Sequence, residues 1–177
     1  MKIIAFGASN SKNSINKALA TYAASLVDGV EVEVEVLDLN DYEIPMFSED
    51  KENEIGQPQL AKNFLAKLAN ADAIVTSYAE HNGSYTAAYK NLLDWSTRIN
   101  REVFNNKPVV FLATSPGPGG AASVLQTATQ SALFFGANVV ATQSIPSFYD
   151  NFDFETFSLR NVEVKDQLVQ TMSQLIK

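Results

Sequence analysis

Short apolar strands alternate with amphipathic helices along the whole sequence, and this order restricts the fold more than any other feature. Five apolar runs have the length and residue types of strands, and segments with helical spacing of apolar residues separate them. The predicted strands are residues 2–6, 31–36, 73–76, 108–113 and 138–141. The predicted helices are residues 15–26, 60–68, 85–98, 121–135 and 164–176. Asp28-Gly29 is predicted to end the first helix, and polar residues 40–56 are predicted to form a long loop.

Strands that alternate with helices indicate an open parallel sheet with helices on both faces. Residues 31–36 alternate glutamate with valine, which is typical of an edge strand with one wet face. The strand order 2-1-3-4-5 puts this strand at the edge and keeps the crossovers right-handed. The sequence therefore predicts one flavodoxin-like α/β domain over residues 1–177, a three-layer sandwich around a five-stranded parallel sheet. Ligands of such sheets bind at the carboxyl ends of the strands, where the turns after strands one, three and four meet.

Composition excludes several kinds of site and partner. The sequence has no cysteine, which excludes disulfides and thiolate chemistry and is typical of a cytoplasmic protein. The formal net charge of −7 argues against nucleic acid as a partner. No apolar run reaches the roughly 20 residues that span a bilayer, so no membrane association is expected.

The turn after the first strand is rich in hydroxyl groups and leads into a helix. Ser9, Ser11 and Ser14 offer hydroxyls, Asn16 an amide and Lys12 a positive charge. The free N–H groups of a helix N-terminus favour an anion such as phosphate. A simple helix cap needs one of these hydroxyls, not three. The turn contains neither a P-loop nor a Gly-x-Gly-x-x-Gly fingerprint.

Two further turns have unusual compositions. Residues 78–85 combine an imidazole, two phenols, a carboxylate and the turn dipeptide Asn82-Gly83. Such a loop can present polar groups to the edge of a ring, although a solvated loop with Ser84 as a helix cap is the alternative. Residues 114–120 are rich in glycine and proline, which allows a ligand to approach the backbone closely.

Together the three turns resemble the NADPH-dependent FMN reductase family, which includes chromate, quinone and azo-dye reductases. The family pattern Gly-Ser-x-Arg-x-x-Ser-x-Asn corresponds to residues 8–16. The seven-residue pattern Ser-Pro-Gly-x-x-Gly-Gly is matched by residues 115–120, which are one residue shorter. The pattern Pro-Glu-Tyr-Asn-Gly-Ser corresponds to residues 79–84, and the following Leu-Lys-Asn-x-x-Asp-Trp corresponds to residues 89–95. Ile44-Pro45-Met46-Phe47 also looks like a family loop.

The resemblance implies roles for the matching positions. The first turn would hold the FMN phosphate, and the second and third turns would line the isoalloxazine ring. The implied FMN-binding residues are Ser9, Ser11, Ser14, Ile15, Asn16, Ala79, Glu80, His81, Asn82, Gly83, Ser115 and Gly117. Asp94 and Arg98 lie on the helix that relatives use for dimer packing. The sequence departs from the family at Ser11, Ala79 and His81, where relatives carry arginine, proline and tyrosine.

The implied function is an FMN-dependent NAD(P)H oxidoreductase. NADPH or NADH would reduce the flavin, and a small-molecule electron acceptor would then reoxidise it, which predicts ping-pong kinetics. The acceptor would be a quinone, an azo compound, a metal ion or free flavin. No catalytic side chain and no metal ligand is nominated, because FMN performs the chemistry. An electron carrier like flavodoxin and a flavin-free binding or regulatory module remain alternatives.

A segment rich in aromatic residues precedes the last predicted helix. Its members are Phe148, Tyr149, Phe152, Phe154 and Phe157. The segment either folds over a small core of its own, or forms an interface or a cover near a neighbouring subunit's flavin. The second interpretation is preferred, because the resemblance implies a homodimer or homotetramer.

Overall fold

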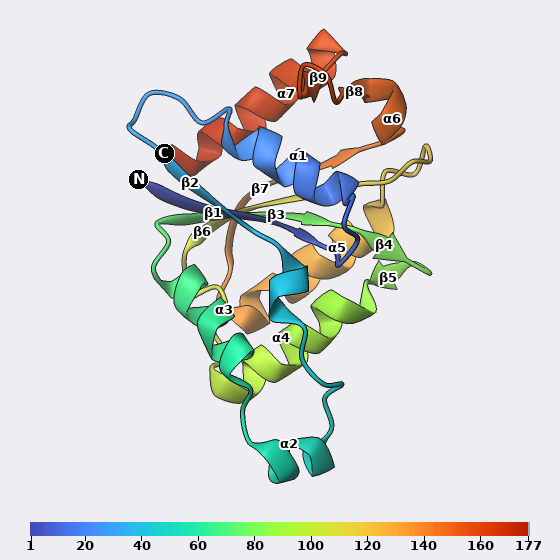
Figure 1. Ribbon diagram of the computed structural model, residues 1–177. Coiled ribbons are helices and arrows are strands. Elements are labelled where there is room, and N and C mark those ends of the chain that lie inside the picture. Colours follow the sequence, from blue (N-terminus) through green and yellow to red (C-terminus); the bar gives the residue numbers. More distant parts are fainter. Residues whose placement is uncertain (177) are drawn as a thin grey trace.

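The computed structural model describes residues 1–176, and its central parallel sheet is the predicted one (Figure 1). Five strands pair in the order β2-β1-β3-β6-β7, and all four pairings are parallel. The strands are β1 (Lys2–Ala8), β2 (Glu33–Leu37), β3 (Ala73–Tyr78), β6 (Pro108–Thr114) and β7 (Asn138–Ile145). Counted along the chain, this is the order 2-1-3-4-5, with the alternating strand at the edge. The predicted flavodoxin-like fold is confirmed.

Helices cover both faces of the sheet (Figure 1). One face carries α1 (Ile15–Ala24) and α7 (Val162–Met172). The other carries α3 (Gln59–Ala69), α4 (Ala87–Ile99) and α5 (Ala122–Ser131). Successive side chains of a strand point to opposite faces, so Ile3 and Ala5 join the core under α1 and α7, whereas Ile4 and Phe6 join the other core. No helix within residues 1–176 is long and apolar enough to cross a membrane.

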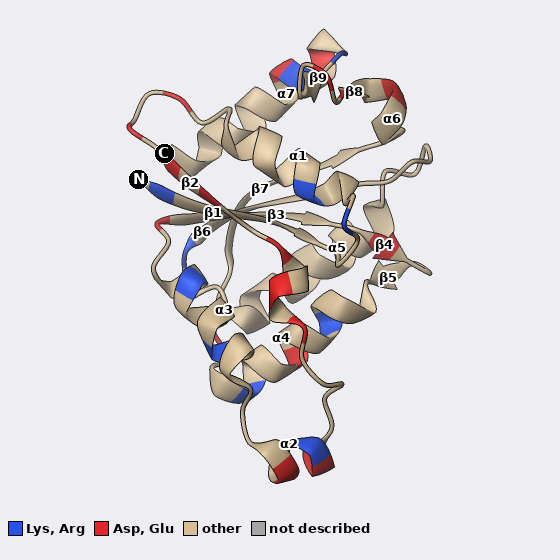
Figure 2. Cartoon of the chain, viewed as in Figure 1, with Lys and Arg blue, Asp and Glu red and all other residues tan. Residues whose placement is uncertain are grey.

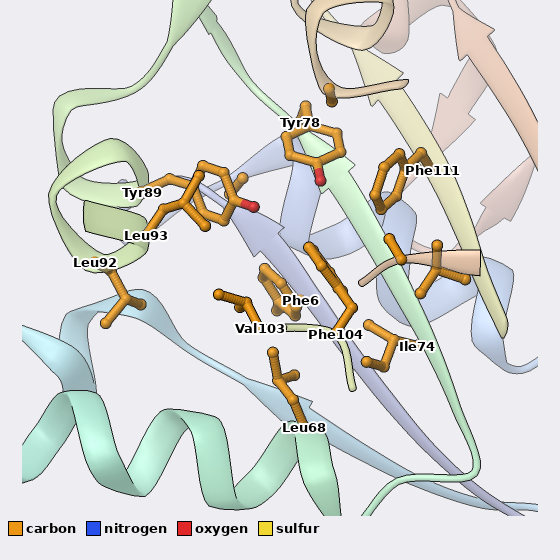
Figure 3. Close-up of a cluster of buried hydrophobic side chains, with 14 of the residues drawn as sticks. Phe6, Leu68, Ile74, Tyr78, Tyr89, Leu92, Leu93, Val103, Phe104 and Phe111 are labelled. Carbon is orange, nitrogen blue, oxygen red and sulfur yellow. The ribbon is translucent and has the colours of Figure 1, made fainter. Parts of the chain in front are cut away.

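Tyr78 is the last residue of β3, at the edge of the sheet formed by the carboxyl ends of the strands, but its ring is buried in the core (Figure 3). The ring lies 5.1 Å from that of Phe111 and 5.5 Å from that of Tyr89, both edge to face. Burial raises the pKa of the Tyr78 hydroxyl well above its ordinary value. This phenol therefore stays protonated and faces other side chains rather than a ligand.

The first helix ends earlier than predicted. The expectation that Asp28-Gly29 ends it is wrong, because α1 ends at Ala24. The C-cap residue is Ser25, whose hydroxyl donates to the carbonyl of Tyr22 at 2.7 Å. A serine hydroxyl that bonds to a helix carbonyl competes with the backbone N–H groups that would continue the helix. Gly29 lies in a later turn, with φ of +89°.

The prediction that residues 40–56 form only a loop is also wrong. A 3₁₀ turn, η1 (Leu39–Tyr42), and a short helix, α2 (Glu49–Ile55), lie there. Ser48 caps α2 by accepting from the N–H of Lys51 at 3.0 Å, and three acidic residues occupy its first turn. No residue of α2 is buried, so the helix lacks the apolar stripe on which the sequence prediction depends.

Several other elements are too short for a periodic pattern to reveal them. They are β4 (Glu80–His81), β5 (Ser84–Tyr85), η2 (Ala132–Phe135), α6 (Phe148–Asn151), β8 (Phe152–Asp153), β9 (Ser158–Leu159) and η3 (Ser173–Ile176). Because β5 takes up Tyr85, α4 starts at Ala87, two residues after the predicted start. The predicted helix 121–135 divides into α5 and η2.

The loop Ile44–Phe47 is attached to α4 by side chains of that helix. The Asn91 amide donates to the carbonyls of Ile44 and Pro45 at 3.1 Å and accepts from the N–H of Phe47 at 2.8 Å. The Trp95 indole donates to the Pro45 carbonyl at 2.7 Å. These bonds give the family-like pattern at residues 89–95 a structural role.

Candidate functional site

A hollow lies at the carboxyl ends of β1, β3 and β6, where the three unusual turns meet. Its volume is about 210 Å³. Nine of the predicted site residues line it: Ser9, Ser11, Ser14, Ile15, Asn16, Ala79, Glu80, His81 and Ser115. Asn13, Thr114, Pro116 and Tyr149 complete the lining. The remaining predicted residues, Asn82, Gly83 and Gly117, belong to the same turns but lie outside the lining.

The first turn ends in a capped helix with free donors. Ser14 is the N-cap of α1, and its hydroxyl accepts from the N–H of Lys17 at 3.1 Å. The Ser14 carbonyl accepts from the N–H of Ala18 at 3.1 Å. The N–H groups of Ile15 and Asn16 have no acceptor among residues 1–176, as expected for a first helical turn. They lie beside the serine hydroxyls and offer an anion two donors at the positive end of the helix.

Asn16 connects the first turn to the third turn and to the end of β3 through its side chain. The amide oxygen accepts from the backbone N–H of Thr114 at 3.1 Å and from the Ser77 hydroxyl at 2.7 Å. The amide nitrogen donates to the Thr114 carbonyl at 3.1 Å. The side chain is almost fully buried. The amide thus ties α1 to the ends of β3 and β6, and the free backbone N–H of Asn16 is the group it leaves for the hollow.

The second turn is a tight hairpin of β4 and β5 rather than an open loop. Asn82 and Gly83 form its two-residue turn with φ of +52° and +76°. Positive φ at both central residues is the type I′ geometry that an Asn-Gly pair favours. The hairpin presents exposed His81 at the hollow. Thr86, not Ser84, caps α4, and its hydroxyl also donates to the Ala8 carbonyl at 2.9 Å.

Glu80 uses its carboxylate to cap a helix. Its Oε2 accepts from the N–H of Val124 at 2.9 Å, in the first turn of α5. The N-cap residue of α5 is Ala121, which has φ of +58° and no side-chain acceptor. Glu80 supplies the missing acceptor and a favourable charge at this helix N-terminus. The contact fixes the hairpin that carries His81 against α5.

Glu80→Ala is expected to lower the free energy of unfolding by about 1–2 kcal/mol, as the loss of a helix cap does. Glu80→Gln keeps an acceptor oxygen and is expected to lower the free energy of unfolding by less than half as much. Urea unfolding of both variants measures the difference. Glu163→Ala, in the first turn of α7, is the matched control and should change stability by less than about 0.5 kcal/mol. Equal losses at both sites would contradict a capping role for Glu80.

The third turn is held by backbone bonds to the segment after β7. The Gly117 carbonyl accepts from the N–H of Ser147 at 2.9 Å, and the Ser115 carbonyl accepts from the N–H of Phe148 at 3.0 Å. The Ser144 hydroxyl donates to the Gly120 carbonyl at 2.8 Å. These bonds bring Tyr149 to the hollow of its own chain. The interpretation from sequence puts its segment at an interface or near a neighbouring subunit's flavin, and Tyr149 is not among the predicted site residues. Its position in the segment rich in aromatic residues was the available signal.

The comparisons with known proteins agree with this geometry. A profile of the family described as NADPH-dependent FMN reductase matches residues 1–150. The chain belongs to this family. A 2-hydroxy-1,4-benzoquinone reductase from a Burkholderia species is 31% identical over 69% of the chain and 64% of its own length. An NAD(P)H-dependent FMN reductase of Pseudomonas aeruginosa is 28% identical over 76% of the chain and 70% of its own length.

Solved structures show the same fold. The FerB flavoenzyme NAD(P)H:(acceptor) oxidoreductase of Paracoccus denitrificans superposes with a TM-score of 0.76 at 22% identity, over 99% of this chain and 94% of that protein. The azoreductase AzrA superposes with a TM-score of 0.62 at 18% identity, over 98% of this chain and the whole of that protein. Family membership confirms the expectation of an oxidoreductase that uses FMN with NAD(P)H.

Proposed function

We propose that this protein is an NAD(P)H oxidoreductase that passes electrons from bound FMN to a small acceptor by a ping-pong mechanism. The observation that carries the proposal is the convergence of three turns on one hollow beside the free N–H groups of Ile15 and Asn16. The acceptor class is a quinone, an azo compound, a metal ion or free flavin. Among these classes, the name of the Burkholderia relative, 2-hydroxy-1,4-benzoquinone reductase, is an argument for a small quinone as the acceptor.

The residues around the hollow fit the parts of FMN. Ser9, Ser11, Ser14 and the backbone of Ile15 and Asn16 would bind the phosphate, since hydroxyls and helix N–H groups bind anions at short range. Ala79 to Gly83 and the turn with Ser115 and Gly117 would border the ring. The Ser9 hydroxyl already accepts from the N–H of Ser11 at 3.1 Å, which orders this turn before a ligand arrives.

Bound FMN supplies two-electron transfer between NAD(P)H and the acceptor, and the protein supplies position. The Glu80 carboxylate is held by α5, and the Tyr78 hydroxyl is buried. Neither of these two groups is therefore assigned a proton-transfer role. One domain would carry the whole activity in the cytoplasm, as a homodimer or homotetramer.

A titration of the apoprotein with FMN, followed by steady-state kinetics with NADH or NADPH and a benzoquinone, tests the proposal. We expect stoichiometric binding and parallel lines in double-reciprocal plots, because one open face would serve both substrates in turn. Binding of FMN without NAD(P)H oxidation would indicate an electron carrier. Failure to bind FMN would indicate a flavin-free module.

His81 is proposed to cover part of the flavin ring. His81→Ala is expected to weaken FMN binding by roughly threefold to tenfold, the range of one lost aromatic contact. His81→Tyr supplies a larger ring and should bind FMN at least as tightly as the wild type. Isothermal titration calorimetry measures both affinities. An unchanged dissociation constant for His81→Ala would rule out this role.

A further inference from the structure

A second, larger hollow lies against the first turns of α1. Its volume is about 480 Å³, within the roughly 300–1,000 Å³ of small-molecule sites. Three of its lining residues, Asn13, Ser14 and Tyr149, also line the hollow proposed to bind flavin. The other six belong to the second hollow alone: Lys12, Lys17, Ala18, Thr21, Phe154 and Phe157. The contacts of these six residues therefore decide what the second hollow can bind.

Two exposed aromatic rings of the second hollow stand on a buried base. Phe148 and Phe152 are buried and stack with their ring centroids 4.8 Å apart. Phe154 packs edge to face on Phe152 at 5.2 Å, and Phe157 does so at 5.3 Å. Phe154 and Phe157 nevertheless remain 54% and 41% exposed. Two rings of the segment rich in aromatic residues thus join the core, and two others border the hollow with little freedom left to lose on binding.

The ring of Phe157 is placed by the backbone turn that precedes it. Phe157 has φ of +49°, in the left-handed region that a bulky side chain rarely adopts. The carboxylate of Asp153 holds this turn, because it accepts from the N–H of Glu155 at 2.8 Å and from that of Thr156 at 3.4 Å. Backbone strain of this kind persists where the surrounding structure imposes it, and it is common where a ligand is clamped.

The charge of the second hollow is opposite to that of the whole chain. Two of its lining residues are lysines and none is acidic, although the chain has a net charge of −7. Figure 2 shows basic residues at the start of α1 and in the turn before it. Lys17 forms an ion pair with Asp38, whereas Lys12 has no ion-pair partner among residues 1–176. The hollow therefore offers a ligand one uncompensated positive charge.

We propose that the second hollow binds an aromatic molecule with one negative charge, an aryl carboxylate or sulfonate, at a site separate from the flavin. The rings of Phe154 and Phe157 contact the aromatic part, and the Lys12 ammonium pairs with the anion. Lys12 lines this hollow and not the one proposed for flavin. A nucleotide would bring two or more negative charges to a single free ammonium group on an acidic chain, so a single charge is the better match. The inference does not depend on the proposed flavin function.

A fluorescence titration with 8-anilinonaphthalene-1-sulfonate tests the proposal, because this probe has aromatic rings and one sulfonate and fluoresces in apolar surroundings. We expect one site per chain with a dissociation constant on the order of tens of micromolar, as for a ligand of this size. N-phenyl-1-naphthylamine has the same rings without the sulfonate and should bind at least threefold more weakly at low salt. Saturation with FMN should leave the affinity for the sulfonate probe within about threefold, because the two sites are separate.

Three variants separate the aromatic contact from the charge. Phe154→Ala/Phe157→Ala should weaken the sulfonate probe by roughly tenfold, as expected for two lost aromatic contacts. Lys12→Gln should weaken the sulfonate probe by about threefold at low salt and leave the neutral probe unchanged. The Lys12 side chain is exposed and unpaired, so this variant keeps the test valid if the double variant fails to fold. Phe134→Ala, on η2 and outside the hollow, is the matched control for an exposed phenylalanine and should change neither affinity.

Four outcomes would overturn the proposal. Equal binding of the sulfonate and neutral probes would show that the hollow does not recognise an anion, and so would an unchanged affinity of Lys12→Gln. Displacement of the probe by FMN would place it in the flavin hollow, and displacement by micromolar AMP would assign the second hollow to a nucleotide. Loss of a dimer in gel filtration of the double variant, with no probe binding to the wild type, would assign the rings to a second copy of the chain. Failure to bind FMN would contradict the proposed function alone, because the probe would still bind.

Discussion

Gly7→Ala is expected to lower the free energy of unfolding by about 3 kcal/mol, at the upper end of overpacking effects. A Cβ at this position would lie 2.3 Å from the backbone nitrogen of Lys17 and 2.8 Å from its Cα. Both atoms belong to the backbone of α1, so no flexible side chain can move aside. Ile3, Ala5 and Gly7 share one face of β1, and their decreasing size lets the helix N-terminus approach the strand.

The same substitution should damage flavin binding. It would move α1 away from the carboxyl end of β1, where Ile15 and Asn16 offer their free N–H groups. We expect the FMN dissociation constant to rise more than tenfold and the melting temperature to fall by roughly 6–12 °C. Gly119→Ala is the control, because a Cβ there meets no atom within 4 Å. A Gly7→Ala variant as stable as the Gly119→Ala variant would show that the backbone of α1 does not lie this close to β1.

The sheet could be predicted because its signals are local. Strands buried on both faces read as apolar runs, and the alternating glutamates of β2 mark an edge. The Asn82-Gly83 pair and the Ser14 cap specify their own backbone geometry. These features fixed the strand order and the place where the turns converge.

The partners of the site residues could not be predicted, because they come from distant parts of the chain. Asn16 bonds to Thr114 and Ser77, and Glu80 bonds to Val124. A polar residue in a turn has the same sequence signature whether it faces a ligand or another turn. Only the fold shows that two of the residues predicted to contact FMN use their side chains to hold the site together.

Asn16→Ala is expected to lower the free energy of unfolding by roughly 3 kcal/mol or more. It would leave three buried groups without partners: the N–H and carbonyl of Thr114 and the hydroxyl of Ser77. Each unsatisfied buried group costs about 1–3 kcal/mol. The first and third turns would also lose their direct link, so FMN binding should weaken by more than tenfold. Asn63→Ala on the exposed face of α3 is the control and should cost less than about 0.5 kcal/mol.

The pH dependence of the stability of Asn16→Asp distinguishes the loss of these hydrogen bonds from a general packing defect. A protonated aspartic acid can reproduce all three bonds, whereas its ionised form repels the Thr114 carbonyl. Burial raises the folded-state pKa of such a carboxyl above its unfolded value of about 3.9, so its stabilisation is present at low pH and is lost as pH rises through the folded pKa. We therefore expect Asn16→Asp to regain stability relative to the wild type as the pH falls from neutral toward the unfolded pKa of about 3.9, and Asn16→Ala to show no such gain. Parallel pH profiles for the two variants in urea unfolding would contradict the role of Asn16 as the hydrogen-bonded link between the turns.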